Sequence, residues 1–247
     1  LAFPLRDLKQ IEERLDIVDA LFKDDNAFET LSDRLRKMVD IERIISKIAT
    51  LKISPRALVQ LGNSLGEIAA IKSYLSEKEN KVLKTFGKGF LENKKVIELI
   101  QSTLKVDAPV LLNKGEVIAQ GVSEELDELR DLLQSGKTHL DDMLARETER
   151  SKISSLKIAF NNVFGYYIEV RNTHKDKVPK DWIRKQTLVN AERYITEELK
   201  EYESKILGAE EKIRSIEGAL YQDLLMSLQL ELNPLKTNAR LLARLDV

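Results

Sequence analysis

The apolar residues that follow Thr196 recur in a heptad pattern, and this pattern constrains the fold more than any other feature of the chain. They alternate steps of three and four over three heptads and are Leu199, Tyr202, Ile206, Ala209, Ile213, Ile216 and Leu220. With Leu224 and Leu228 the helix is expected to continue until Asn233-Pro234 ends it. Roughly 35 residues at about 1.5 Å each give about 50 Å of helix. Because its apolar seam is narrow, such a helix needs a partner helix, which predicts a coiled coil.

The segment from Ser123 to Arg150 is the best candidate for that partner. Ser123 is a favourable N-cap, and Glu124 and Glu125 in the first turn complement the helix dipole. Its apolar positions are Leu126, Leu129, Leu133, Leu140 and Leu144. The two helices are expected to run antiparallel and to carry the segment between them at their far end.

The first 121 residues predict a helical body. One helix, with Pro4 just ahead of it, is predicted from the spacing of Leu8, Ile11, Leu15, Val18 and Phe22. Further helices are predicted over Phe28–Ile48, from Ser54-Pro55 onward, and over about Leu91–Leu104. A short irregular or hairpin-like excursion is predicted for residues 107–121.

The segment Phe160–Ile206 differs in composition, since it holds seven of the 14 Phe, Tyr and Trp residues. Strict alternation predicts two strands, over 156–160 and 166–170, joined by a turn at Asn161-Asn162. Gly165 predicts a bulge or a close approach, and residues 182–195 are expected to be extended with a kink near Asn190. The predicted fold class is therefore mainly α, a long-helix bundle or lever whose antiparallel coiled-coil arm carries a small β-rich module at its tip.

The net charge of −1 hides an asymmetry. Residues 150–194 contain ten basic and four acidic residues, a net charge of +6, whereas the remainder is 30 basic against 37 acidic. A basic, aromatic module on an acidic body favours a polyanion as partner. Chance clustering of charge on a solvated face is the alternative.

Several function classes find no support in the residues. Cysteine is absent, which fits a reducing, cytoplasmic setting, and no run of about 18 apolar residues predicts a membrane span. His139 and His174 have no partners at metal-ligand spacing. Ser135-Gly136-Lys137-Thr138 resembles the end of a phosphate-binding loop, but Asp131 stands where that loop needs glycine, so a helical irregularity at Gly136 is expected. We therefore expect neither an enzyme nor a cofactor.

The segment Arg184–Arg193 offers a different chemistry. Its cations, amides and hydroxyl are Arg184, Lys185, Gln186, Thr187, Asn190 and Arg193. Such groups suit phosphate oxygens, and contacts of this kind carry no sequence information. Tyr166, Tyr167 and Trp182 have the chemistry to stack on unpaired bases, but we favour them as the core of a small sheet.

Several long motifs resemble the MutS family of DNA mismatch-repair proteins, and together they cover essentially the whole chain. They are FGYYIEV at 164–170, VP..WIRKQTL at 178–188, NAERYIT.ELKEYE.KIL at 190–207, LNKGEVI..GV.EELDELR at 112–130, PL.D...IEERLDIVDAL at 4–21 and ERIISKIA..KISPR.L..L at 42–61. The chain begins at Leu1 without a methionine and stops at Val247 without a tail, so we expect a fragment with both ends cut. Its expected parts are a helical core and lever (1–148), a β-rich clamp (149–196) and the returning lever helix (197–247).

In that family the clamp grips the duplex backbone, and two clamps of a dimer close around the DNA. The resemblance therefore implies double-stranded DNA, a second MutS subunit and a MutL-type repair protein as partners of the parent, in the bacterial cytoplasm near the nucleoid. The mismatch-reading domain and the ATPase domain have no counterpart here, so ATP and Mg are expected in the parent only. The expected DNA-backbone contacts are Asn161, Asn162, Lys175, Lys177, Arg184, Lys185, Thr187, Asn190 and Arg193. The alternative is a structural coiled-coil interaction arm that does not bind DNA.

Overall fold

The computed structural model describes residues 5–246, so Pro4, expected just ahead of the first helix, lies outside the described residues. The contacts divide the chain into two packed units. We call residues 5–122 together with 217–246 the helical unit, and Ser123–Ile216 the mixed unit. The functional boundaries expected after residues 148 and 196 stay predictions.

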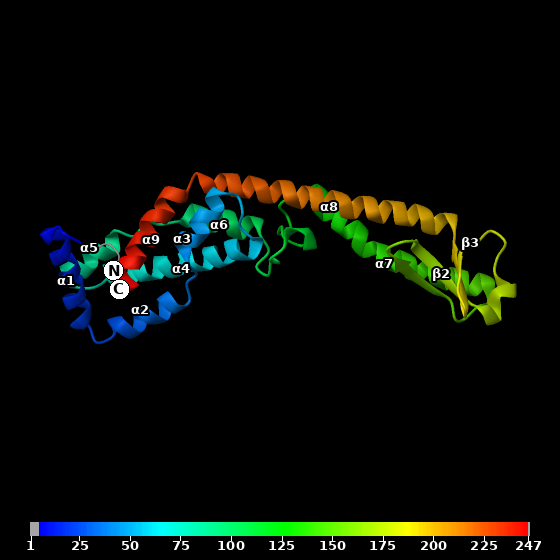
Figure 1. Cartoon of the computed structure of the whole chain (residues 1–247), viewed down its shortest axis with the longest axis horizontal. Coiled ribbons are helices and arrows are strands. Elements are labelled where there is room, and N and C mark those ends of the chain that lie inside the picture. Colours follow the sequence, from blue (N-terminus) through cyan, green and yellow to red (C-terminus); the bar gives the residue numbers. More distant parts are fainter. Residues whose placement is uncertain (1–4, 247) are drawn as a thin grey trace. The chain divides into compact units, whose positions relative to one another are not determined.

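The helices of the helical unit follow one another with short connections (Figure 1). They are α1 (Leu8–Phe22), α2 (Ala27–Arg36), α3 (Ile41–Ala49), α4 (Pro55–Ser76), α5 (Lys81–Lys88), α6 (Lys94–Thr103), the short 3-10 helix η1 (Leu112–Lys114) and α9 (Leu232–Asp246). The last part of α8 (Glu197–Gln229) also belongs to this unit.

Helix α4 supplies the centre of the helical unit and confirms the helix predicted from Ser54-Pro55. The Ala57 backbone N–H donates to Ser54 Oγ at 3.4 Å, and Pro55 occupies the first turn. Leu58, Leu61 and other apolar residues of α4 are fully buried. Helices α2, α3, α5 and α6 pack around α4, so it organises this core.

The single helix predicted over Phe28–Ile48 is wrong, because the structure breaks it into α2 and α3. Asp40 has an extended backbone, and its carboxylate accepts from the Arg43 N–H at 2.9 Å as the N-cap of α3. The Val39 N–H donates to Ser64 Oγ at 3.1 Å. These polar contacts satisfy the groups that a break exposes, so the apolar spacing continues while the helix does not.

The structure differs from the expected helices in three further places. Helix α5, begun by Asn80 as N-cap, was not predicted. Helix α8 ends at Gln229, and Asn233-Pro234 lies in the first turn of α9, where proline is tolerated. No irregularity occurs at Gly136, which lies inside the continuous helix α7 (Glu124–Ser151).

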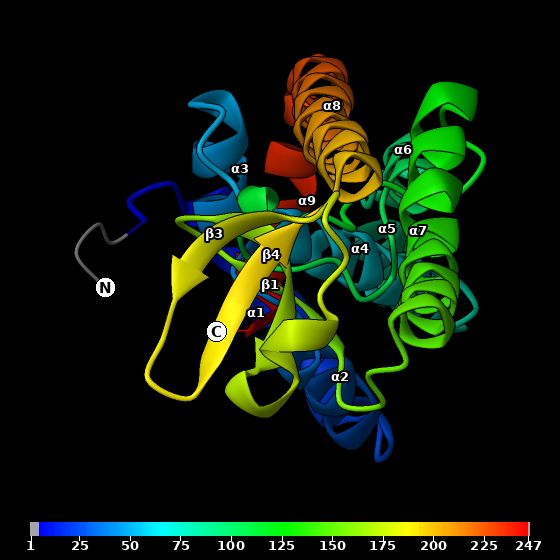
Figure 2. The same cartoon turned by 90° about the vertical axis from the view of Figure 1, so that its right-hand side faces the viewer.

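The mixed unit contains α7, the first part of α8, and one antiparallel sheet of four strands in the order β1-β2-β4-β3. The strands and their 3-10 helix are β1 (Lys157–Asn161), β2 (Gly165–Arg171), η2 (Asn172–Lys177), β3 (Ile183–Thr187) and β4 (Ala191–Ile195). Figure 2 shows β3 and β4 as a hairpin whose turn projects from the sheet. The two predicted strands and their turn are confirmed, and the expected kink near Asn190 is the turn of this hairpin.

The core of the mixed unit lies between one face of the sheet and the two long helices. Ile168 and Val170 of β2 pack there with Met143 of α7 and with Leu199 and Ile206 of α8. Arg146 of α7 forms an ion pair with Glu198 of α8 at 2.5 Å. Gly136, which lies nearer the start of α7, is so close to α8 that a Cβ at this position would lie 2.7 Å from the Tyr202 hydroxyl. Lower numbers on α7 thus face higher numbers on α8, so the two helices run antiparallel.

Candidate nucleic-acid interface

Strand β3 presents the most exposed group of predicted contact residues. Arg184 pairs with Tyr194 and Gln186 with Arg193, so Lys185 is the extra residue of a β-bulge. A bulge turns a side chain away from the regular alternation of a strand. Arg184, Lys185 and Thr187 are all exposed, which makes this edge strand a surface of cations and a hydroxyl.

Glu192 of β4 partly neutralises this surface. Its carboxylate accepts hydrogen bonds from the Tyr194 hydroxyl and, at 3.3 Å, from the Arg184 guanidinium. The Tyr194 hydrogen bond is the main reason that the pKa of Glu192 lies below its ordinary value, and Arg184 and Lys175 lower the pKa further. Burial is the main cause that raises the pKa of Tyr194 to about 12, and Glu192 adds to it. Arg184 is therefore a cation with a partner already in place, and Lys175 lies near the same carboxylate.

Helix η2 is attached to the turn of the β3–β4 hairpin. The Asn172 backbone N–H donates to the Asn190 carbonyl at 3.1 Å, and the Asn172 side-chain amide donates to the Val189 carbonyl at 2.9 Å. These bonds hold η2, which carries Lys175 and Lys177, beside the end of the sheet where Asn190 lies. The structure thus brings the predicted residues of η2 together with those of β3 and its turn.

Three lysines of this surface are exposed and have no direct ion pair in the described part of the chain, namely Lys175, Lys177 and Lys185. We call this surface, formed by η2, β3 and the hairpin turn, the basic end of the sheet. An ammonium group without a direct ion pair is available to phosphate oxygens, whereas a paired one must first give up its partner. Of the three, Lys175 also interacts with the nearby Glu192 carboxylate. The three lysines are therefore the strongest members of the predicted set on structural grounds.

Arg193 is positioned quite differently. Its guanidinium lies 4.2 Å from the centroid of the Tyr167 ring, donates to Gln186 at 3.0 Å and to Glu169 at 3.4 Å, and its side chain is mostly buried. This network ties β2, β3 and β4 together across the face of the sheet opposite the helices. Arg193 is thus a cross-strand residue whose donors are largely used inside the sheet.

Asn161 and Asn162 lie at the other end of the sheet. Asn161 Oδ1 accepts from the Val163 and Phe164 N–H groups at 2.8 and 3.3 Å, so this side chain shapes its own turn. Asn162 is exposed. Strand β2 separates this turn from η2 and the hairpin turn, and the steps from Gly165 to Arg171 at about 3.3 Å each place the two ends about 20 Å apart. One phosphate cannot contact both ends, so only an extended polyanion could use them together.

Sequence reasoning missed two acidic residues that position these groups. One is Glu192, described above. The other is Glu203 of α8, whose carboxylate accepts from the Tyr166 N–H at 3.3 Å and occupies the space where Gly165 would carry a Cβ. Gly165 also has φ of +75°, so the close approach predicted there is confirmed. The signal for Glu203 was the glycine itself, but only the fold reveals which side chain approaches it.

The aromatic residues favoured as core are buried in the sheet, as predicted. Trp182 and Tyr194 are buried in the core between the sheet and the helices, and Tyr166 packs against that core, whereas Tyr167 is buried beneath Arg193 on the opposite face. Phe160 and Phe164 near the Asn161 turn are the more exposed ones. Among the described residues no group of His, Cys, Asp and Glu side chains is arranged to hold a metal ion. No helix in the same part of the chain is long and apolar enough to cross a membrane.

The whole sequence is similar to bacterial proteins named DNA mismatch repair protein MutS. The protein from Christiangramia forsetii is 55% identical over 246 residues, those from Flavobacterium johnsoniae and Parabacteroides distasonis are 52% and 51% identical, and each match covers 100% of this chain. The chain belongs to the MutS family. It spans 28% of the length of these MutS relatives.

A match to one domain of the MutS family covers a defined part of this chain. The family profile described as MutS family domain IV matches residues 121–212. This range nearly coincides with the mixed unit, Ser123–Ile216, which was delimited from contacts alone. The MutS domain IV match therefore covers the sheet, its basic end and the helix pair on which the sheet packs, and that domain is not the ATPase domain of the family.

Proposed function

We propose that the mixed unit is a DNA clamp that holds the duplex by its phosphate backbone through the basic end of the sheet. The observation that carries this proposal is the group of exposed, unpaired lysines, Lys175, Lys177 and Lys185, on a platform made firm by the Asn172 bonds. Phosphate contacts of this kind give affinity without sequence preference. Membership of the MutS family supports duplex DNA as the polyanion.

The geometry of the sheet favours a long ligand over a small anion. The hairpin turn with η2 and the Asn161-Asn162 turn are separated by about 20 Å, the length of β2. A free phosphate or a nucleotide would occupy only one of them, whereas a DNA backbone passes several phosphates over such a distance. In this proposal Thr187 and Asn190 add hydrogen bonds at the basic end, and Asn162 adds one at the other.

The proposal for the parent protein follows from the family. The pair α7 and α8 would act as an antiparallel coiled-coil arm of a lever, transmitting an ATP-driven rearrangement to the clamp. ATP and Mg would bind only outside the matched segment, so this chain itself would be non-catalytic. A second MutS subunit would supply the opposing clamp, and a MutL-type protein would be a further partner.

The test is a titration of the chain with duplex DNA at increasing salt. We expect Lys175→Ala, Lys177→Ala and Lys185→Ala together to weaken binding to duplexes of unrelated sequence equally. They should also reduce the slope of log K against log salt by up to about 2.7, since each lost phosphate contact removes about 0.9. The matched control replaces three exposed lysines of the helical unit, Lys9, Lys81 and Lys84, and should leave the slope nearly unchanged. Equal slopes for both triple variants would contradict the site.

The second candidate function is a structural interaction arm, which the buried contacts between α7 and α8 favour. In that case the chain would show no duplex binding even at about 50 mM salt, where phosphate contacts are strong. A stable complex with another protein under the same conditions would then identify the arm as the functional element.

A further inference from the structure

Glu192 is an acidic residue inside the basic end of the sheet. It lies opposite Thr187 in the pairing of β3 with β4, and its side chain is only 13% exposed. Its carboxylate divides its two oxygens between two partners. Oε2 accepts from the Tyr194 hydroxyl, and Oε1 accepts from the Arg184 guanidinium at 3.3 Å. The sheet thus holds one oxygen, while the other engages a cation of the surface proposed to bind DNA.

The packing around Tyr194 fixes the position of this carboxylate. Tyr194 is buried, and its ring centroid lies 5.9 Å from that of Trp182 in the core of the mixed unit. A carboxylate that is already positioned loses little side-chain freedom when Arg184 pairs with it. The pair therefore avoids part of the entropy loss that usually weakens an ion pair at the surface. The Arg184 side chain itself is 61% exposed, so a ligand in solvent can still reach it.

Glu192 acts on Lys175 as well as on Arg184. The Tyr194 hydrogen bond is the main reason that the pKa of Glu192 lies below its ordinary value, and both cations lower this pKa further. The carboxylate is therefore ionised at neutral pH and faces cations of β3 and η2. A DNA phosphate that approaches either cation meets the negative charge of Glu192, which repels it. Glu192 thus takes the place beside Arg184 that a phosphate would occupy.

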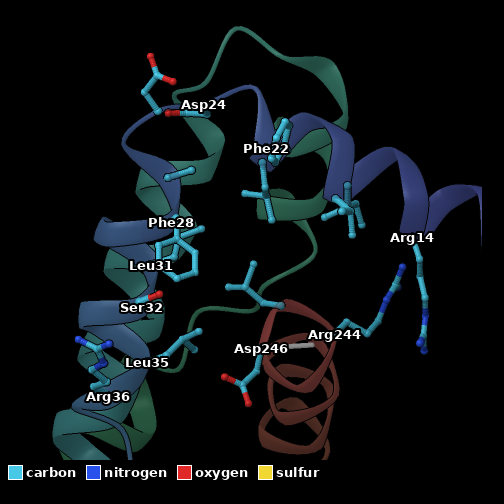
Figure 3. Close-up of a pocket in the computed structure, with 16 residues that line it drawn as sticks. Arg14, Phe22, Asp24, Phe28, Leu31, Ser32, Leu35, Arg36, Arg244 and Asp246 are labelled. Carbon is cyan, nitrogen blue, oxygen red and sulfur yellow. The ribbon is translucent and has the colours of Figure 1, made fainter. Parts of the chain in front are cut away.

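The pocket between α1, α2 and α9 in the helical unit has a different distribution of charge (Figure 3). Its charged lining residues are three arginines and three aspartates, namely Arg14, Arg36, Arg244, Asp24, Asp25 and Asp246. Because the two signs balance, this pocket offers a polyanion no net attraction. At the basic end the cations outnumber the carboxylates of Asp176 and Glu192, so removing one carboxylate there should strengthen the attraction for DNA.

We propose that Glu192 is a built-in competitor of DNA phosphate, which holds Arg184 whenever the backbone does not. This inference rests on the proposed DNA grip and adds a residue that sets the strength of that grip. When a phosphate leaves, Arg184 returns to Glu192 and is not left without a partner, so the contact exchanges easily. The pair thereby lowers the affinity of the clamp and speeds the release of DNA. Contacts that exchange easily suit a protein that holds DNA without sequence preference, because it can then move along the backbone.

The test repeats the duplex titration with Glu192→Gln. Glutamine still accepts from the Tyr194 hydroxyl but has no charge to hold Arg184, so it separates competition from a merely structural role. We expect the slope of log K against log salt to increase in magnitude by about 0.9, the contribution of one additional phosphate contact. Binding should become about eightfold tighter at about 0.1 M salt. The release of DNA, measured by stopped-flow, should slow by a similar factor, since changes at one interface act mostly on dissociation.

Asp176→Asn is the matched control. Asp176 is an exposed residue of η2 without an ion pair in the described part of the chain, so its replacement removes a charge from the same surface but frees no cation. It should tighten binding by less than about twofold, because exposed charges are screened. Adding Arg184→Ala to Glu192→Gln should remove most of the gain. An equal gain from Asp176→Asn, or an undiminished gain in the double variant, would overturn competition for Arg184.

A second comparison does not depend on replacing Glu192. Arg184→Ala should weaken binding less than Lys185→Ala, because Arg184 must first leave its partner whereas Lys185 has no direct ion pair in the described residues. A larger loss at Arg184 would contradict the proposal.

The outcomes separate this inference from the clamp proposal. Glu192→Gln might leave DNA binding unchanged while the triple lysine variant still weakens it. Glu192 would then serve only to hold Tyr194, and this inference would fail alone. Absence of duplex binding by the unaltered chain and by Glu192→Gln would overturn both proposals together.

Discussion

Helices α1 and α8 carry the same apolar spacing but meet opposite surroundings. In α8 the first part of the seam, Leu199, Tyr202 and Ile206, lies against α7 and the sheet, and Leu199 is 0% exposed. In α1 the corresponding residues are largely exposed to solvent, and Leu15 is 61% exposed. The comparison shows that a heptad pattern predicts that a helix needs a partner. It does not indicate which segment is the partner. In α8 the partner is present in the chain, whereas no described residue covers the seam of α1.

The largest expected effect compares two leucines at equivalent seam positions. Leu199→Ala should lower the free energy of unfolding by about 2–5 kcal/mol, because it leaves a cavity in a packed core. Leu15→Ala should change it by less than about 0.5 kcal/mol, since the side chain is already largely solvated. Urea denaturation of both variants measures the contrast. Equal losses would show that α1 is buried as α8 is, and the comparison would fail.

A second prediction tests how α8 is joined to the sheet. Gly165→Ala should cost about 2–3 kcal/mol, because φ of +75° is unfavourable for alanine and the new Cβ would collide with the Glu203 carboxylate. Adding Glu203→Ala should recover part of this loss, since only the collision is relieved. A double-mutant cycle measures the coupling between the two sites. Strict additivity would mean that Glu203 does not approach the glycine.

A third prediction compares two glycines in the helix pair. Gly136→Ala should destabilise the chain by about 1 kcal/mol, because its Cβ would lie 2.7 Å from the Tyr202 hydroxyl and 3.0 Å from Ile206. Gly208→Ala in α8 meets nothing within 4 Å and should stabilise the chain by about 0.5–1 kcal/mol through helix propensity. Thermal unfolding gives both signs. Stabilisation by both substitutions would argue against close packing of α7 on α8.

The smallest effect concerns the ion pair that holds the end of α1. Lys78 donates to the Asp24 carboxylate at 2.6 Å, and this bond is the main reason that the pKa of Asp24 lies below its ordinary value of 3.8. A lowered pKa means that the stability from this pair is present above pH 3.8 and is lost as the pH falls through the folded pKa. Asp24→Asn should therefore cost up to about 1 kcal/mol at neutral pH and little in strong acid.

Urea denaturation of Asp24→Asn across this range checks the sign of the pH dependence. Asp25→Asn, at an exposed neighbour without an ion pair in the described part of the chain, is the control. A cost for Asp24→Asn that persists undiminished in acid would show that the carboxylate acts through something other than its charge. That result would also show that Asp24 does not stabilise this end of α1 through its ion pair with Lys78.

Much of the fold was predictable because its signals are local. Ser54 and Ser123 marked helix starts, and strand alternation located β1 and β2. The break between α2 and α3 was missed although Asp40 is a local N-cap, and the other contact at the break, from the Val39 N–H to Ser64, joins residues 25 apart. Apolar spacing carried through the break, so periodicity alone gave no warning.

The residue types of the candidate site could be predicted from the sequence, but their positions relative to one another could not. The sequence indicated which side chains suit phosphate, but it gave Arg193 and Lys185 similar chemistry. Only the fold places Arg193 against Tyr167, Glu169 and Gln186, and puts Lys185 in a bulge on the edge strand. Asn161-Asn162 likewise falls at the opposite end of β2 from Asn190, a separation that depends on strand pairing.

By itself the sequence determined that long amphipathic helices would form, that a basic β module would interrupt them, and that the chain resembles the MutS family. These properties follow from the identity and spacing of neighbouring residues. The tertiary structure alone decided which seam is buried, which cation is already paired, and which carboxylate fills the space above Gly165. Those outcomes depend on contacts between residues far apart in the chain, and burial and pairing are properties of such contacts rather than of any local pattern.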